Sequence, residues 1–126
     1  CQGDDINPGL KIEGVPEGAK SLALIFDDPD AQQVVGYTWI HWLVKDIPND
    51  VNEIKEDSIP GTEVVNSFRR ESYGGPCPPS GVHKYFFKLY ALNVETLDAG
   101  NSDDFYKKVE EHKIEEAVLM GKYTKS

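Results

Sequence analysis

The chain has 126 residues, of which 39% are hydrophobic, and 22 acidic against 13 basic side chains give it a formal net charge of -9. This charge argues against nucleic acid as a partner, because lysine and arginine must neutralise phosphates there, and against electrostatic docking on anionic membranes. The apolar runs are the length of strands and fall far short of the ~20 residues that span a bilayer. We therefore expect a single domain, 1–126, without a transmembrane segment, and take the cytoplasm as the default location.

Five segments have residue patterns typical of β-strands and are separated by turn residues. They comprise residues 10–14, 20–26, 36–47, 62–68 and 82–94. The second is almost continuously apolar, which predicts a strand covered on both faces, whereas 48–61 is predicted to be a polar loop. The stretch 69–81 is rich in glycine and proline and is expected to be irregular, because proline cannot donate to a ladder and glycine permits positive φ.

Alternation within the third and fifth of these segments predicts which side chains share a face of the sheet. In the third segment, one face carries Trp39, His41 and Leu43, and the other carries Ile40, Trp42 and Val44. In the fifth, a single face carries His83, Tyr85, Phe87, Leu89 and Ala91. Both histidines are therefore expected on strands, next to large apolar side chains.

The hydrophobic period changes near residue 100. Asn101 or Ser102 can cap a helix that has acidic residues in its first turn, and Phe105, Val109 and His112 follow at helical spacing. The segment 113–123 continues an apolar stripe, with Gly121 as a natural helix stop. Strands first and helices last predict a sandwich-like β core with short C-terminal helices packed on its edge or end.

Several polar groups occur where these strands begin or end. Asp28 and Asp30 follow an apolar strand, His41 lies inside another, and His83 and Tyr85 open a third. Taken singly, Asp-Pro-Asp is ordinary turn chemistry, and a histidine in an apolar strand is usually satisfied within the core. Together they can converge at one end of the sandwich and form a pocket in an apolar wall.

Local charge favours an anion in that pocket. Between residues 66 and 90 a single acid, Glu71, accompanies four basic residues, Arg69, Arg70, Lys84 and Lys88. A histidine beside an aspartate gains positive character, and backbone N–H groups of a glycine-rich loop supply further donors. The cysteines, Cys1 and Cys77, form no Cys-x-x-Cys zinc signature, so we expect no metal and no cofactor.

The segments "LALIFDDPDA", "WIHWLV" and "YGGPCPPSGVHKYFFKLYAL", with "NSF" before the last of them, occur in this order. With the opening "CQGDDINPGL", they resemble the phosphatidylethanolamine-binding protein family. The chain is similar to its short bacterial and archaeal branch, which is related to Raf kinase inhibitor protein. The resemblance runs from Cys1 to about Tyr123, nearly the whole chain.

The resemblance implies an all-β fold, a sandwich of two antiparallel sheets, with a small cavity that binds phosphate-like anions. The Asp-Pro-Asp segment of the family matches Asp28 and Asp30 here. Its Trp-x-His positions in the cavity wall match Trp39 and His41, and Tyr73 is expected at the rim.

The second half of the implied site follows along the chain. The glycine-proline loop of the family matches the stretch that contains Gly75, Cys77 and Pro78, and its His-x-Tyr pair matches His83 and Tyr85. In the family, the histidines and backbone donors contact the anion and an aspartate lies beside them.

The sequence also departs from the family pattern. Gln32 replaces a proline, Asn7 replaces a serine, and Arg69 stands where the family often has glycine. Family members carry an additional strand before the segment that begins at Cys1. The domain is therefore expected to lack this strand, which would leave a sheet edge open to pairing and make an oligomer possible.

The leading hypothesis is a binding protein, not an enzyme. Its ligand would be a small anion, a phospholipid head group or a phosphorylated partner, and relatives suggest a regulator of kinase signalling. The alternative is a serine protease inhibitor. A metal-dependent hydrolase that uses the Asp/His cluster is less favoured, because no nucleophile-base geometry follows from the spacing.

Overall fold

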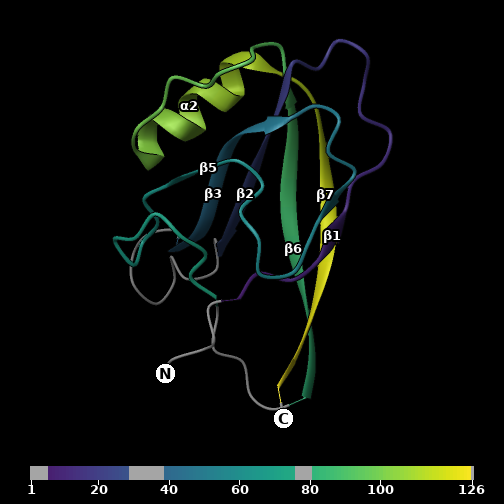
Figure 1. Cartoon of the computed structure of the whole chain (residues 1–126). Helices are drawn as coiled ribbons and strands as arrows, with labels where there is room; N and C mark the ends of the chain where they lie inside the picture. Colours follow the sequence, from purple (N-terminus) through teal and green to yellow (C-terminus); the bar gives the residue numbers. More distant parts are fainter. Residues whose placement is uncertain (1–5, 29–38, 76–80, 126) are drawn as a thin grey trace.

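The computed structural model describes residues 6–28, 39–75 and 81–125. In these ranges the strands form two antiparallel sheets (Figure 1). The larger sheet contains, in spatial order, β5 (Thr62–Val64), β3 (Trp39–Pro48), β2 (Ser21–Asp28), β6 (Gly81–Leu92) and β7 (Lys113–Lys125). The smaller sheet pairs β1 (Leu10–Lys11) with β4 (Glu53–Ile54). The predicted all-β sandwich is confirmed.

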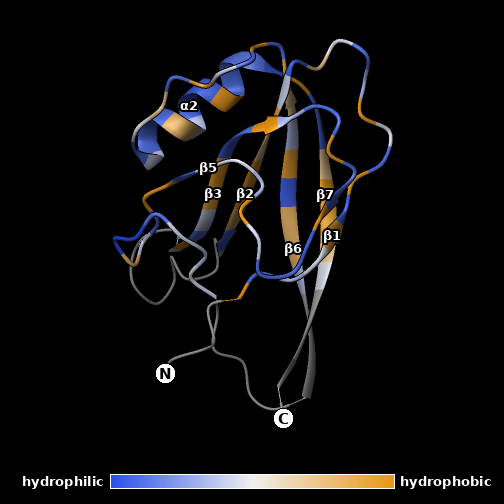
Figure 2. Ribbon diagram, viewed as in Figure 1, coloured by the Kyte–Doolittle hydropathy of each residue, from blue (hydrophilic) through white to orange (hydrophobic). Residues whose placement is uncertain are grey.

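Strand β2 lies at the centre of the larger sheet and is buried on both faces, as its continuous apolar sequence predicts. Its even-numbered residues contact one core, which the small sheet covers, and its odd-numbered residues contact a second core beneath the helix. Apolar colour accordingly follows β2, β3 and β6, whereas the helix is mostly hydrophilic (Figure 2). Each fully buried Leu, Ile or Phe in these cores contributes about 1.5–3 kcal/mol of transfer free energy.

The helix α2 (Ser102–His112) confirms the capping pattern read from the sequence. The side chain of Asn101 accepts a hydrogen bond of 2.9 Å from the backbone N–H of Asp104, which satisfies one donor of the first turn. Phe105 and Val109 are buried against the outer face of the five-stranded sheet. The helix therefore covers the second core.

The prediction that 113–123 continues as a helix is wrong. The backbone becomes extended at Lys113, and β7 then pairs with β6 along almost its whole length. A long-range pairing outweighed a local stripe of apolar residues, which is compatible with either period. Gly121 is not a helix stop, because a Cβ there would lie 2.7 Å from Cγ of Pro8, so the glycine leaves room for close packing.

Two further predictions need correction at the level of single elements. Strand β4 lies inside 48–61, which was predicted to be a polar loop, because Ile54 turns into the core opposite Leu10. Strand β5 occupies only the first three residues of the predicted strand 62–68. The remainder of that segment bends into a loop that becomes important at the candidate site.

The alternation predicted for β3 is interrupted by a β-bulge. Phe26 pairs with Trp42, whereas the next residue of β2 pairs with Ile40, so His41 is the additional residue. The ring of His41 stacks on Phe26, and Trp42 belongs to the same core, while Leu43 and Ile40 contact the opposite core. The predicted placement of His41 with Leu43, opposite Trp42, is therefore wrong.

Candidate functional site

Aromatic rings from four distant parts of the chain meet at Phe26, near the end of β2. The centroid of the Phe26 ring lies 4.9 Å from that of His41, 5.7 Å from that of Tyr85 and 6.1 Å from that of Tyr73. The ring of Phe87 completes the cluster, with its centroid 4.2 Å from that of Phe26. The structure thus brings together three side chains that the sequence proposed for the site, around a fourth that it did not name.

The imidazole of His41 is fixed by the backbone of the loop that follows β5. Its side chain is almost enclosed, with the residue only 7% exposed, and Nδ1 lies 2.6 Å from the carbonyl oxygen of Gly74. A carbonyl only accepts hydrogen bonds, so Nδ1 carries the proton and donates it. The Gly74 N–H donates in return to the His41 carbonyl at 2.9 Å. Protonation of Nε2 then decides whether the ring is charged.

Asn66 clamps this loop to β3 and is only 5% exposed. Its Nδ2 donates to the carbonyl oxygens of His41 at 3.1 Å and of Ser72 at 2.8 Å. Its Oδ1 accepts from the backbone N–H groups of Phe68 at 2.8 Å and of Arg70 at 3.1 Å. One side chain therefore ties both ends of the loop to the strand that carries the histidine.

The sequence reasoning did not single out Phe26 or Asn66. Phe26 looks like one more apolar residue of a buried strand. For Asn66 a signal existed in "NSF", because an asparagine at the end of an apolar stretch, just before a glycine-rich loop, is a candidate for capping backbone groups.

Phe68 joins the loop to the aromatic cluster and brings a cation with it. Its ring meets that of Trp39 edge-to-face at 5.1 Å and lies 5.9 Å from that of His41. The guanidinium carbon of Arg70 lies 5.4 Å from the centroid of the Phe68 ring. A Cβ at Gly74 would approach this ring to 2.3 Å, so only glycine fits there. The site therefore has a positive group at its margin.

The other residues predicted for the site are described only in part. Asp28 is the last residue of β2, and His83 lies in β6, but their side chains are outside the described residues. Asp30, Cys77 and Pro78 also lie outside the described residues. Gly75 follows Tyr73, and a Cβ at Gly75 would lie 2.8 Å from the Tyr73 ring.

The acid next to Asp28 belongs to the opposite face of the sheet. The carboxylate of Asp27 accepts a 2.6 Å hydrogen bond from the Tyr106 hydroxyl of α2 and lies 3.4 Å from the ammonium of Lys88. Burial, and then this hydrogen bond, raise the pKa of Tyr106. Burial is also the main cause that raises the pKa of Tyr90 to about 12. These groups fasten the helix to the sheet and do not form part of the candidate site.

The described part of the chain contains neither a cluster of metal-ligating side chains nor a long apolar helix. No group of three or more histidine, cysteine, aspartate or glutamate side chains gathers there as a metal site would require. None of its helical segments is long and apolar enough to cross a membrane.

Comparison with known proteins places these features in context. The sequence model of the family described as phosphatidylethanolamine-binding protein matches residues 1–124. A UPF0098 protein of Methanothermobacter thermautotrophicus is 46% identical over 132 residues, which cover 98% of this chain and 85% of that protein. A UPF0098 protein of Aquifex aeolicus is 50% identical over 77% of this chain and 60% of its own length.

Solved structures also resemble this chain over its whole length. CT736 of Chlamydia trachomatis, described as a homologue of phosphatidylethanolamine-binding protein, is 36% identical with a TM-score of 0.80. The comparison covers 100% of this chain and 86% of CT736. YbcL of E. coli, described as a member of the mammalian PEBP family, is 34% identical with a TM-score of 0.81, covering 100% of this chain and 84% of YbcL.

Proposed function

Because the chain belongs to the phosphatidylethanolamine-binding protein family, we propose that it binds a small anion at the end of the sandwich. The ligand would be a phosphate, either free or as the head group of a lipid or phosphorylated partner. The site would be formed around His41, Tyr73 and Tyr85, which meet at Phe26.

The observation that carries this proposal is the orientation of His41. Its Nδ1 is committed to the Gly74 carbonyl, so a second proton can reside only on Nε2. A charged imidazole enclosed by aromatic rings would gain from an anion, since a charge-assisted hydrogen bond is stronger away from bulk water. Arg70, held near the Phe68 ring, adds positive potential.

The family resemblance supplies the remaining parts of the proposed site. His83 would provide a second imidazole, with Asp28 and Asp30 beside it. Backbone N–H groups around Gly75, Cys77 and Pro78 would supply further donors, and Trp39 would form part of the wall.

Calorimetric titration with sulfate and with inorganic phosphate tests the proposal. Sulfate keeps its charge over the relevant range, so it reports on the protein alone. A protonated histidine loses its positive charge as the pH rises. We therefore expect the affinity for sulfate to fall about tenfold or more between about pH 6 and about pH 8. Equal affinity for sulfate at both pH values would contradict a cationic histidine ligand.

Substitutions then test whether His41 is the histidine that binds sulfate. His41→Asn can keep a donor to the Gly74 carbonyl but has no titratable group, so it should remain folded and lose most of the affinity for sulfate. His41→Ala should lower both stability and affinity, because the residue is buried in a strand. His112→Asn is the matched control, since that ring lies at the end of α2 beside Asn93 and should not affect binding.

Regulation of a kinase and inhibition of a serine protease stay predictions from the resemblance. If either activity survives in His41→Asn while anion binding is lost, the two functions use different surfaces. A stoichiometric metal in freshly purified protein would favour the hydrolase alternative instead.

A further inference from the structure

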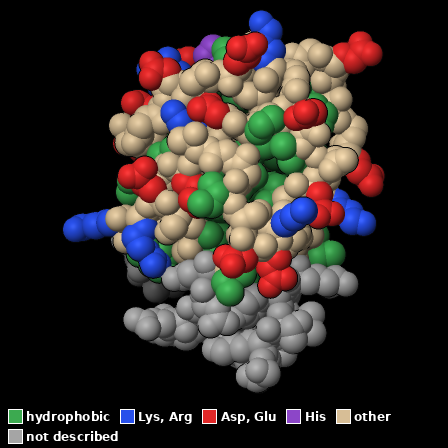
Figure 3. Space-filling model, viewed as in Figure 1, with side chains coloured by type: hydrophobic (Ala, Val, Ile, Leu, Met, Phe, Trp, Pro, Cys, Tyr) green, Lys and Arg blue, Asp and Glu red, His purple; other side chains and the backbone are tan. Residues whose placement is uncertain are grey.

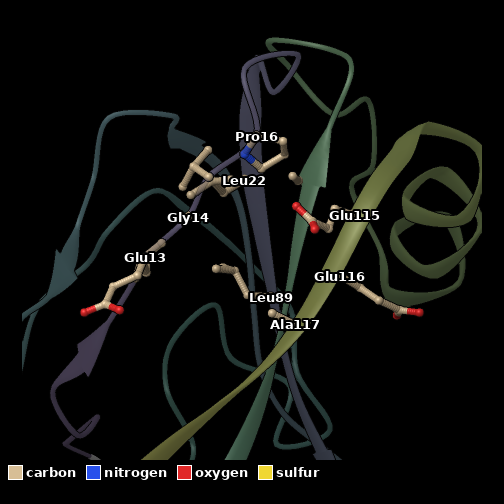
Figure 4. Close-up of a pocket in the computed structure, with 11 residues that line it drawn as sticks. Glu13, Gly14, Pro16, Leu22, Leu89, Glu115, Glu116 and Ala117 are labelled. Atoms are coloured by element: carbon tan, nitrogen blue, oxygen red, sulfur yellow. The ribbon is translucent and has the colours of Figure 1, made fainter.

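A hollow lies on the same face of the five-stranded sheet as Phe26, but nearer the other end of the sandwich. It has a volume of about 120 Å³ and lies between the segment 12–16 and residues 115–117 of β7 (Figure 4). Its floor is formed by Leu22, Leu89 and Ala91. Leu22 precedes Phe26 by four residues of β2, which is about 13 Å along a strand. The hollow is therefore separate from the candidate anion site.

The floor of this hollow is apolar, and one carboxylate faces it. Glu115 and Glu116 are consecutive in β7, so their side chains leave opposite faces of the sheet. In Figure 4 the Glu115 carboxylate points into the hollow, whereas Glu116 points away from it, and Glu13 on the other wall is also directed outward.

The two neighbouring glutamates also differ in their partners. Glu116 is 3.7 Å from the ammonium of Lys113. Within the described ranges, the Glu115 carboxylate has neither a hydrogen bond nor an ion pair, although the Glu115 backbone pairs with β6. An unpaired carboxylate at the mouth of an apolar hollow is complementary to a cation that carries an aliphatic chain.

We propose that this hollow binds a small aliphatic ammonium ion. Its hydrocarbon part would lie on Leu22, Leu89 and Ala91, and its cationic end would face Glu115. An apolar cavity of about 150 Å³ can admit benzene, so a volume of about 120 Å³ suits a chain of about four or five heavy atoms.

The charge of the protein favours a cation over an anion at this place. The net charge is -9, and acidic side chains are scattered over the face seen in Figure 3. The preference is thus opposite in sign to that proposed for His41. Because the ligand has few atoms and the hollow is open to solvent, we expect weak, millimolar binding.

The probe is n-butylammonium, with n-butanol and n-butyrate as controls of similar size, added to the full chain at constant ionic strength. Amide chemical shifts in 12–16 and 115–117 should move with n-butylammonium. An ion pair near the surface adds little, so n-butylammonium should bind about two- to fivefold more tightly than n-butanol. Butyrate should bind more weakly than either compound.

Substitutions of the two neighbouring glutamates form a matched pair. Glu115→Gln should remove the preference for the amine over the alcohol and leave binding of the alcohol intact. Glu116→Gln removes the same charge from the opposite face and should preserve the preference. Ala117→Leu, at the rim, should weaken the binding of both n-butylammonium and n-butanol by filling the hollow. His41→Asn should leave the affinity for both compounds unchanged.

Three results would overturn the proposal. The first is the absence of shift changes in 12–16 and 115–117 with any of the probes. The second is equal binding of n-butylammonium and n-butyrate. The third is an equal loss of preference in Glu115→Gln and Glu116→Gln, which would indicate a general response to net charge.

Discussion

Removal of the Asn66 side chain should be among the most damaging polar substitutions in this protein. Its four hydrogen bonds join the loop to β3 and to itself. At about 1 kcal/mol for each bond the loss would be about 4 kcal/mol. Water can replace some partners, because the loop is partly exposed. We therefore expect Asn66→Ala to lower the free energy of unfolding by about 3 kcal/mol.

Urea unfolding measures this change, provided that the m-value stays constant. Asn66→Asp is an informative second variant, because it keeps the acceptors for Phe68 and Arg70 but sets a carboxylate against the carbonyls of His41 and Ser72. It should be at least as destabilising as Asn66→Ala near neutral pH. As a matched control, Asn49→Ala removes a single 2.9 Å hydrogen bond to Ala19 and should cost about 1 kcal/mol or less.

The reasoning fails if Asn66→Ala and Asn49→Ala cost the same. Amide exchange gives a second, local measure. The Gly74 N–H bonds to the His41 carbonyl, which Asn66 also contacts. It should exchange faster in Asn66→Ala than in the wild type, and protection that is unchanged would place the stability of the loop elsewhere.

Two further predictions concern backbone strain and alkaline stability. Arg69 has a positive φ of 62°, so Arg69→Gly should raise the free energy of unfolding by about 1 kcal/mol, and an equal gain in Arg69→Ala would contradict a backbone cause. The raised pKa values of Tyr90 and Tyr106 mean that the folded state favours the neutral phenols. Their contribution is complete below about pH 10 and is lost as the pH rises from there toward the folded-state pKa values. The free energy of unfolding in urea should therefore be lower at about pH 11 than at about pH 9, and Tyr106→Phe should reduce this difference. Equal wild-type stability at the two pH values would refute a stabilising role for the neutral phenols.

Most strands could be predicted because their information is local. The apolar run of β2 and the strict alternation of β6 each identify a strand and its buried face, and Asn101 identifies the start of α2. Strand β7 could not be identified in this way. Its apolar residues fit a helix equally well, and only pairing with β6, a partner that local sequence does not reveal, decides the outcome.

The candidate site, too, could be predicted only in part from local sequence. Motifs drew attention to His41, Tyr73 and Tyr85, but the contacts that position them depend on Phe26 and Asn66, which are ordinary residues for their segments. Arg69 is an intermediate case. The sequence marked it as a departure from glycine, and the positive φ supplies the physical meaning of that departure.

The bulge and the loop after β5 depend on each other. In a regular strand without the bulge, alternation would place the His41 ring on the face of Leu43, away from Phe26. A bulge, however, leaves backbone groups without partners in the ladder, and buried groups of this kind must be satisfied.

The loop supplies those partners along the edge that β5 leaves uncovered. Ser67 bonds both the N–H and the carbonyl of Ile40, and the His41 carbonyl receives the N–H of Gly74 and the amide of Asn66. The loop therefore replaces the missing end of β5 as a partner for β3. The same contacts aim Nδ1 of His41 at the Gly74 carbonyl, so the geometry that stabilises the bulge also selects which ring nitrogen can take a second proton.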